Sequence, residues 1–282
     1  MHDLRQERLQ ELGHRVRGLR KGAGLSGAEL AERAGVTQPT VSKIETGRML
    51  PSSEVFDRLA GALGIDQGER AELFALLQQV HTEVADIRQS GNGALAQQEA
   101  ISTREQRAAA VDSFQCAMVP SLLQTAEYAR RAFEAAGHED DRDVGRAVAA
   151  RVERQGVLYE RGRRFSFVLT EGALRTWPGS PDVMRAQLAK ILDVSTLENV
   201  SVSVVPWSAT VPTFPLHGFV IYDESAITVE TFTSELLLSN AQDVAIYRQT
   251  FAAFREVALF GDAMRELVSR IARDYDQSPF RR

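Results

Sequence analysis

Residues 37–48 form a short polar run whose side chains could hydrogen-bond to the edges of DNA bases. The amide of Gln38 can pair bidentately with adenine, and Lys43 can donate to guanine or to a phosphate. Thr40 can offer its methyl group to thymine or its hydroxyl to a phosphate. The candidate DNA-contacting residues are Thr37, Gln38, Pro39, Thr40, Ser42, Lys43 and Arg48.

These side chains need a helix that presents them on one face. Val41 and Ile44 are three residues apart, which places both on the buried side of a helix and leaves the polar side chains outward. Thr37 stands at the expected start of that helix, where free backbone N–H groups and the helix dipole attract a phosphate. Arg48 follows the helix, in a position for a contact with the DNA backbone.

A second short helix is expected to brace the first. Ser26 and Glu29 have the spacing of a capping box, and Gly35 supplies a left-handed turn. Pro39 fits the first turn of the following helix because its missing N–H costs nothing there, and Gly47 ends that helix. Two short helices joined by a glycine turn suit a DNA major groove, which is about 12 Å wide.

The remaining apolar spacing predicts an all-α bundle of about five helices in this part of the chain. A helix over residues 6–23 is indicated by leucine and valine at three- and four-residue intervals. A fourth helix should open at residues 51–53 and close at Gly64. A fifth should begin with a capping box at residues 66–69 and run to about Val80.

The run over residues 25–47, LSGAELAERAGVTQPTVSKIETG, resembles the helix-turn-helix domain of the lambda-repressor/Cro and Xre family of regulators. The resemblance covers about 55 residues and implies double-stranded DNA as a partner. The sequence departs from the family at Gly27, where glutamine is usual, so one phosphate contact of the family is not implied here.

The expected domain boundary lies where glycines and small polar residues gather, at residues 89–93. We therefore predict a DNA-binding domain over residues 1–88, a linker over 89–98 and a larger domain over 99–282. Helical patterns are expected at 99–114, 122–136, 141–160, 182–194, 239–258 and 262–275. Short strands are expected at 165–170, 200–205, 218–222 and 227–232. The larger domain is therefore predicted to be α+β with a small sheet.

Two motifs of the larger domain resemble the Scr1-type, antitoxin-like regulators of actinobacteria, which carry a C-terminal domain of unknown function. They are MVPSLLQTAEYAR at residues 118–130 and ARVERQ at residues 150–155. The sequence departs from that family at Ser121, where glycine is usual, and at residues 261–263, where a serine-containing turn is common. The resemblance implies a regulator encoded beside a very small partner protein, with no enzymatic activity.

Charge and composition agree with a DNA-binding head on an acidic body. Residues 1–65 carry 10 Lys and Arg against 8 Asp and Glu, whereas the rest carry 23 against 30. The chain has one cysteine, no apolar run long enough to span a membrane, and a charged start unlike a signal peptide. A cytoplasmic homodimer acting on a palindromic operator is the expectation.

Other chemistry finds little support in the sequence, and neither a catalytic residue, a metal nor a cofactor is predicted. The five histidines are scattered, and residues 138–141 are better explained as an acidic helix start than as a metal site. The loop at 206–215 is either a docking surface or a proline-stiffened connection. The cluster of Arg151, Arg154, Arg161, Arg163 and Arg164 is either an anion site or, as we favour, a solvated salt-bridged face.

Three functions therefore stay open at this point. The leading one is a transcriptional regulator. The second is an antitoxin-like interaction module that holds a small partner protein and binds DNA only for autoregulation. The third is a sensor whose larger domain binds a small molecule.

Overall fold

The structure, a computed structural model, describes residues 2–86, 93–137, 140–176, 180–232 and 234–276. The chain divides into two compact units. The N-terminal unit comprises Met1–Ala85 together with Leu236–Val244. The larger unit comprises Asp86–Glu235 and Ala245–Arg282.

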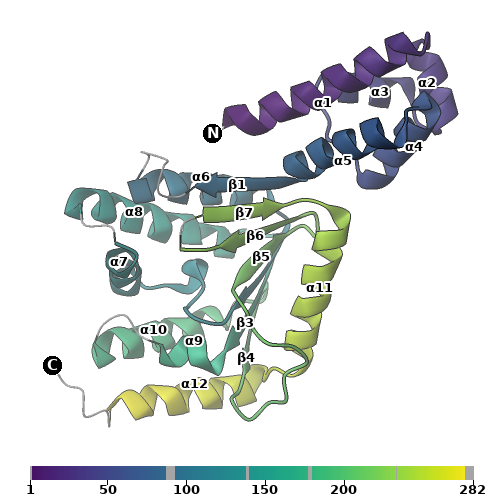
Figure 1. Cartoon of the computed structure of the whole chain (residues 1–282). Helices are drawn as coiled ribbons and strands as arrows, with labels where there is room; N and C mark the ends of the chain where they lie inside the picture. Colours follow the sequence, from purple (N-terminus) through teal and green to yellow (C-terminus); the bar gives the residue numbers. More distant parts are fainter. Residues whose placement is uncertain (1, 87–92, 138–139, 177–179, 233, 277–282) are drawn as a thin grey trace. The chain divides into compact units, whose positions relative to one another are not determined.

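Five helices build the first part of the N-terminal unit (Figure 1). Glycines in the left-handed conformation end α2 and α4, and Ser26, Thr37, Ser52 and Asp66 cap the helices that follow them. The five helices are α1 (His2–Gly22), α2 (Gly27–Ala34), α3 (Gln38–Glu45), α4 (Ser53–Leu63) and α5 (Gln67–His81). The predicted five-helix bundle is confirmed.

Two apolar clusters hold these helices together. In the first, Leu30 of α2, Ile44 of α3 and Leu59 of α4 pack against one another. In the second, Leu12 of α1 packs with Phe56 of α4 and with α5. Each of these side chains is at most 1% exposed, and burying one contributes roughly 1.5–3 kcal/mol. The inner face of α3 is therefore fixed by core packing.

A mixed sheet forms the centre of the larger unit, with strand order β6-β5-β2-β3-β4. Strands β2, β3 and β4 are parallel, whereas β5 pairs antiparallel with both β2 and β6. The strands are β2 (Ala110–Gln115), β3 (Arg164–Thr170), β4 (Val200–Val205), β5 (Phe219–Tyr222) and β6 (Ala226–Glu230). Two further strands, β1 (Thr82–Asp86) and β7 (Ser234–Leu238), are neighbours where the chain passes between the units.

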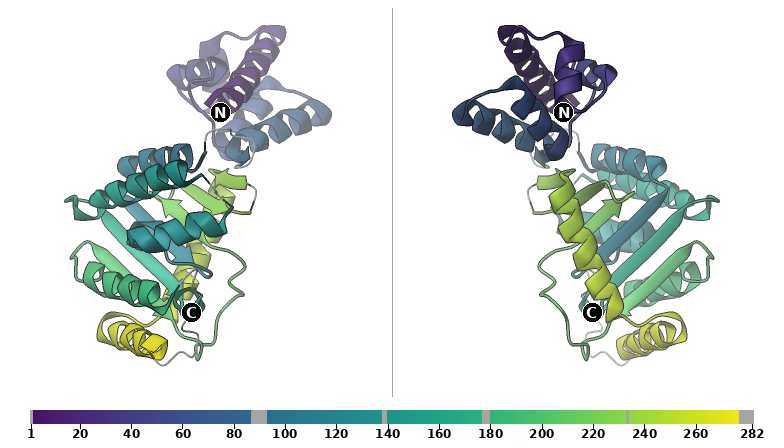
Figure 2. Two further views of the ribbon diagram at one scale, coloured as in Figure 1. Left: turned by 90° about the vertical axis from the view of Figure 1, so that its left-hand side faces the viewer. Right: turned by 90° about the vertical axis from the view of Figure 1, so that its right-hand side faces the viewer.

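Helices cover both faces of this sheet. Figure 2 shows α7, α8 and α10 on one face and α11 on the other. Phe254 of α11 stacks on Phe114 of β2 with ring centroids 4.3 Å apart. The helices are α6 (Gly93–Arg107), α7 (Ala126–Ala135), α8 (Asp141–Arg154), α9 (Glu171–Arg175), α10 (Pro181–Val194), α11 (Ala241–Glu256) and α12 (Gly261–Asp276). The 3₁₀ turns are η1 (Ser121–Leu123) and η2 (Gln155–Tyr159).

The α+β prediction is confirmed, and all four expected strands are present within two residues of their predicted ends. The prediction of a helix over residues 99–114 is wrong at its end. The helix stops at Arg107, and residues 110–115 form β2 because Val111 and Phe114 are buried between β3 and β5. Strands β1 and β7 were not predicted. Of the predicted linker, residues 89–92 lie outside the described residues and residues 93–98 belong to α6, so the boundary stays a prediction.

Candidate nucleic-acid interface

The turn between α2 and α3 is set by local hydrogen bonds. Ser26 and Glu29 cap α2 reciprocally: the Ser26 hydroxyl accepts from the Glu29 N–H, and the Ser26 N–H donates to the Glu29 carboxylate at 2.7 Å. Gly35 ends α2 with φ of 63°, a conformation that L side chains rarely adopt. The chain therefore leaves α2 at a fixed angle and enters α3 two residues later.

The threonines at the start of α3 are engaged with each other. The Thr37 hydroxyl accepts from the backbone N–H of Thr40, and the two hydroxyl oxygens lie 2.8 Å apart. Thr37 is exposed and Thr40 is half-buried. The Thr37 hydroxyl thus caps the helix, and its contact with the Thr40 hydroxyl holds both groups at the start of α3.

The two faces of α3 differ sharply in exposure. Val41 and Ile44 are 2% and 1% exposed and pack in the core. The remaining predicted contact residues are exposed on α3 or just after it: Gln38, Pro39, Ser42, Lys43 and Arg48. Pairs four residues apart share a helix face, so Gln38 lies beside Ser42 and Pro39 beside Lys43. The structure therefore brings the predicted side chains of α3 onto one accessible surface.

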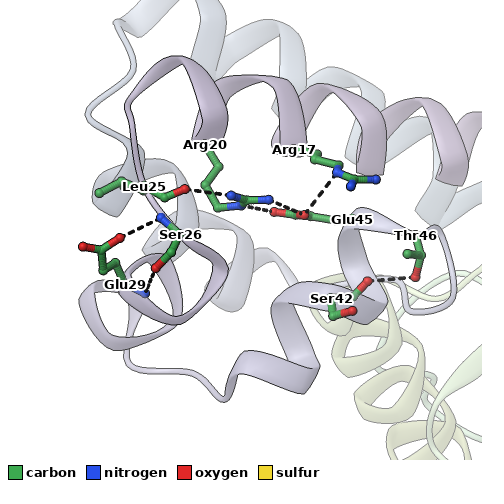
Figure 3. Close-up of polar contacts among 8 residues, drawn as sticks. All are labelled: Arg17, Arg20, Leu25, Ser26, Glu29, Ser42, Glu45 and Thr46. Carbon is green, nitrogen blue, oxygen red and sulfur yellow. Dashed lines mark hydrogen bonds and ion pairs between the residues drawn. The ribbon is translucent and has the colours of Figure 1, made fainter.

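A buried ion pair ties α3 to α1 (Figure 3). Nε and Nη2 of Arg20 donate to the two carboxylate oxygens of Glu45 at 2.5 and 3.0 Å, and Nη1 of Arg20 donates to the Leu25 carbonyl at 2.7 Å. The hydrogen bond to Glu45 raises the pKa of the Arg20 guanidinium. The carboxylate of Glu45 therefore has its partner inside its own domain.

The close approach of α1 and α3 depends on two glycines, Gly13 and Gly47. The sequence pattern did not indicate Gly13, and it predicted Gly47 only as the end of a helix. A Cβ at Gly13 would lie 2.5 Å from the Ile44 carbonyl oxygen. Gly47 has φ of 64°, and its carbonyl accepts from Nε2 of Gln6 at 2.9 Å. Nothing in the spacing of polar residues indicated Gly13, because its role appears only when the two helices are docked.

The segment after α3 presents Arg48. The Thr46 hydroxyl donates to the Ser42 carbonyl at 2.8 Å, and the Arg48 N–H donates to the Lys43 carbonyl at the same distance. Residues 46–52 then lead to α4, whose N-cap is Ser52. Arg48 is exposed on this segment, three residues after the end of α3 at Glu45.

Comparison with known proteins agrees with this geometry. A helix-turn-helix domain family matches residues 11–73, and the family described as "Domain of unknown function (DUF5753)" matches residues 98–270, which is more than half of the chain. The chain belongs to the DUF5753 family. Over 49 residues it is 49% identical to an uncharacterized HTH-type transcriptional regulator of Methanothermobacter thermautotrophicus. That alignment covers 17% of this chain and 71% of the relative.

Solved structures with an overall likeness are remote. They include TrmBL2, an archaeal chromatin protein (12% identity, TM-score 0.36, 73% of this chain and 66% of that one). Another is Nuc of the phospholipase D family from Salmonella typhimurium (12% identity, TM-score 0.34, 64% of this chain and 97% of that one). A third is phosphatidylserine synthase of Haemophilus influenzae (11% identity, TM-score 0.39, 89% of this chain and 59% of that one). This chain thus spans about two thirds of the length of TrmBL2 and less than two thirds of the length of the phosphatidylserine synthase.

In the DUF5753 domain, the two motifs singled out in the sequence meet around three buried glutamines. Nε2 of Gln155 donates to the carbonyls of Gln124 and Ser121 at 2.8 and 3.1 Å. Nε2 of Gln124 donates to the Val119 carbonyl, and Nε2 of Gln187 donates to the Leu123 carbonyl. These residues secure the backbone around η1, which is a structural role. Ser121 has no positive φ, so the conformation does not require the glycine usual there.

The arginine cluster of the DUF5753 domain is neither one anion site nor a solvated face, and our favoured interpretation was wrong for its first two members. Arg154 pairs with Glu105 at 2.5 Å, with side chains 2% and 5% exposed. Arg151 donates to Gln98 and Gln124, and burial lowers its pKa to about 9. The other three are spread out: Arg161 is exposed, Arg163 bonds to the carbonyls of Glu105 and Gln106, and Arg164 pairs with Asp112.

The loop at residues 206–215 is anchored at one end and exposed at the other. The backbone N–H of Trp207 donates to Glu171 at 2.9 Å, and the Arg175 guanidinium lies 4.9 Å from the Trp207 ring centroid. Trp207 is nevertheless 68% exposed and Phe214 80%. The loop is therefore held at its Trp207 end and presents an apolar side chain to solvent at its Phe214 end.

Within the described residues, no group of three or more His, Cys, Asp or Glu side chains could hold a metal ion. Asp140 caps α8 by accepting from the Arg142 and Asp143 N–H groups, as a helix start requires. His138 and Glu139 lie outside the described residues. Burial raises the pKa of the Cys116 thiol. Among the helices that the structure describes, none is both long and apolar enough to cross a membrane.

Proposed function

We propose that this protein is a cytoplasmic, sequence-specific transcriptional regulator that reads DNA with α3. One observation carries the proposal: α3 buries Val41 and Ile44, is fixed to α1 by Glu45, and exposes the polar side chains that can reach base edges. A helix held in this way can enter a major groove without losing its orientation.

The proposed contacts divide into two kinds. Gln38 and Lys43 face bases, where a bidentate amide favours adenine and an ammonium favours guanine. Pro39 and Ser42, their neighbours on the exposed face, line the same groove. Contacts to the DNA backbone are assigned to Thr37, Thr40 and Arg48, and these fix register without reading sequence.

We further propose that the protein acts as a homodimer. Two recognition helices related by a two-fold axis reach half-sites about 34 Å apart, one helical turn of DNA. The operator is then an inverted repeat, and binding weakens steeply with salt as counterions are released.

The test is genome-wide immunoprecipitation of the tagged protein, followed by mobility shifts on the recovered site. Wild type should enrich an inverted repeat and bind it, and Lys43→Ala should bind it at least about tenfold more weakly. Lys21→Ala, an exposed cation at the end of α1, is the matched control and should bind like wild type. Failure of wild type to bind any recovered site would remove the proposal.

A second function is favoured by the surface of the DUF5753 domain. Phe214 and Leu216 are 80% and 86% exposed, and residues 206–216 include no charged side chain. An exposed apolar segment of this kind marks protein–protein contact sites. We therefore propose that the protein also belongs to the antitoxin-like Scr1 type and binds a small protein encoded nearby through this loop. Co-purification at fixed stoichiometry, lost in Phe214→Ser with Leu216→Ser, tests it.

A further inference from the structure

A segment from late in the sequence completes the N-terminal unit. Residues Leu236–Val244 belong to this unit, although more than 150 residues separate them from α5. The segment holds the end of β7 and the first residues of α11. Because α11 continues as far as Glu256, one helix contributes residues to both units.

Four polar contacts fasten this segment to α5. The backbone N–H and the hydroxyl of Ser239 both donate to the His81 carbonyl, at 3.0 and 3.2 Å. Nδ1 of His81 lies 3.4 Å from the Ser239 hydroxyl oxygen. Nδ2 of Asn240 donates to Oε1 of Gln78 at 2.8 Å. Residues 239 and 240 therefore supply polar partners to the last turn of α5.

His81 connects this attachment to the segment that carries Arg48. Its side chain is buried, and Nε2 lies 3.0 Å from the carbonyl oxygen of Pro51, to which it donates in the tautomer protonated at Nε2. Pro51 directly precedes Ser52, the N-cap of α4. Arg48 lies only three residues before Pro51. One imidazole thus bridges the 239–240 segment and the end of the loop after α3.

We propose that residues 239–240, acting through His81, position the loop over residues 46–52 and therefore the DNA contact of Arg48. The inference rests on the proposed function. In this arrangement His81 and Ser239 are positioning residues that do not touch DNA.

The experiment uses the full-length chain with Ser239→Ala and Gln78→Ala combined. These changes remove the side-chain bonds between α5 and the segment. The side-chain oxygen Oδ1 of Asn240, which accepts from the Gln242 N–H, stays in place to cap α11. The control combines Gln79→Ala, at the exposed neighbour of Gln78 on α5, with Gln242→Ala, at an exposed position in the first turn of α11. DNA affinity is measured as a function of salt, and hydrogen exchange is measured for the amides of residues 48–50.

We expect the double variant to bind the operator at least about threefold more weakly, consistent with the loss of ordinary hydrogen bonds. The slope of log Kd against log salt should fall by about one, because one phosphate contact is weakened. Exchange at residues 48–50 should quicken, while exchange in α2 and α3 stays as in the control.

Two results would overturn the inference. One is unchanged affinity, slope and exchange relative to the control. The other is weaker binding with an unchanged salt slope and unchanged exchange at residues 48–50, which would mean that the segment acts elsewhere. If wild type itself binds no operator, the proposed function fails. The exchange measurement then still reports whether the segment holds the loop.

Discussion

Arg20 and Glu45 form a forked ion pair that joins α1 to α3. Both side chains are largely buried, 12% and 8% exposed, and the two N–H···O distances are 2.5 and 3.0 Å. A bidentate pair fixes orientation as well as distance. It therefore restricts rotation of α3 about its own axis, and that rotation decides which side chains face outward.

Glu45→Ala should destabilise the helical bundle by roughly 3–5 kcal/mol, because it leaves the Arg20 guanidinium without its buried partner. The measurement is hydrogen exchange of the α1 and α3 amides, which isolates this unit from the larger one. The variant Arg20→Met with Glu45→Met should recover a large part of the loss, since the buried charge is then gone.

Arg17 supplies the control for this pair. Its Nε lies 4.0 Å from the same carboxylate, but its side chain is 51% exposed. Arg17→Ala should change stability by no more than about 1 kcal/mol, because exposed pairs are screened by solvent. Equal losses in Arg17→Ala and Glu45→Ala would contradict the assignment of Arg20 as the partner that matters.

Gly13→Ala and Gly18→Ala should have opposite effects although both lie on α1. A Cβ at position 13 would meet the Ile44 carbonyl oxygen at 2.5 Å, so the helices must separate, at a cost of about 1–3 kcal/mol. At position 18 the added Cβ meets nothing within 4 Å, and alanine favours the helix by about 1 kcal/mol. Thermal unfolding followed by circular dichroism compares them, and equal behaviour would argue against the close approach.

The sequence predicted most of the helical bundle because its signals are local. The capping box at Ser26, the left-handed Gly35 and the cap at Thr37 act within a few residues and appear in the structure as expected. The exposed face of α3 followed from the positions of Val41 and Ile44. Such features need no knowledge of what lies far along the chain.

The features that escaped prediction are those made by distant residues. Residues 99–114 are rich in good helix formers, yet the last part becomes β2 because it pairs with β3 and β5, which come at least 49 residues later. The bond between Ser239 and His81 spans 158 residues. Periodicity and capping carry no information about such pairs.

Base and backbone contacts should separate in DNA-binding experiments. Gln38→Ala should cost roughly 1–3 kcal/mol on the best operator and relax the preference at one base position. Arg48→Ala should weaken binding to all sequences alike and lower the salt slope by about one. Mobility shifts on a set of single-base operator variants at several salt concentrations distinguish them. A loss of sequence preference in Arg48→Ala would reverse the two assignments.

Breaking the ion pair between Arg154 and Glu105 should make the stability of the larger unit depend on pH. Burial already raises the pKa of Glu105, and the attraction of Arg154 opposes that rise. Arg154→Met should therefore raise this pKa further and cost roughly 3–5 kcal/mol at neutral pH.

A carboxyl whose folded pKa is raised destabilises the folded state increasingly as pH rises from its unfolded value, about 4.3, through its folded value. The loss of unfolding free energy in Arg154→Met should thus be small near pH 4.5 and large at pH 8. Adding Glu105→Gln should remove this pH dependence.

Tryptophan fluorescence follows unfolding of the larger unit, since both tryptophans fall within Asp86–Glu235. Arg164→Met is the control, because Arg164 pairs with Asp112 while 55% exposed and should change stability by about 1 kcal/mol at most. If Arg154→Met lost the same unfolding free energy at both pH values, the unpaired carboxylate of Glu105 would not be the cause of the loss.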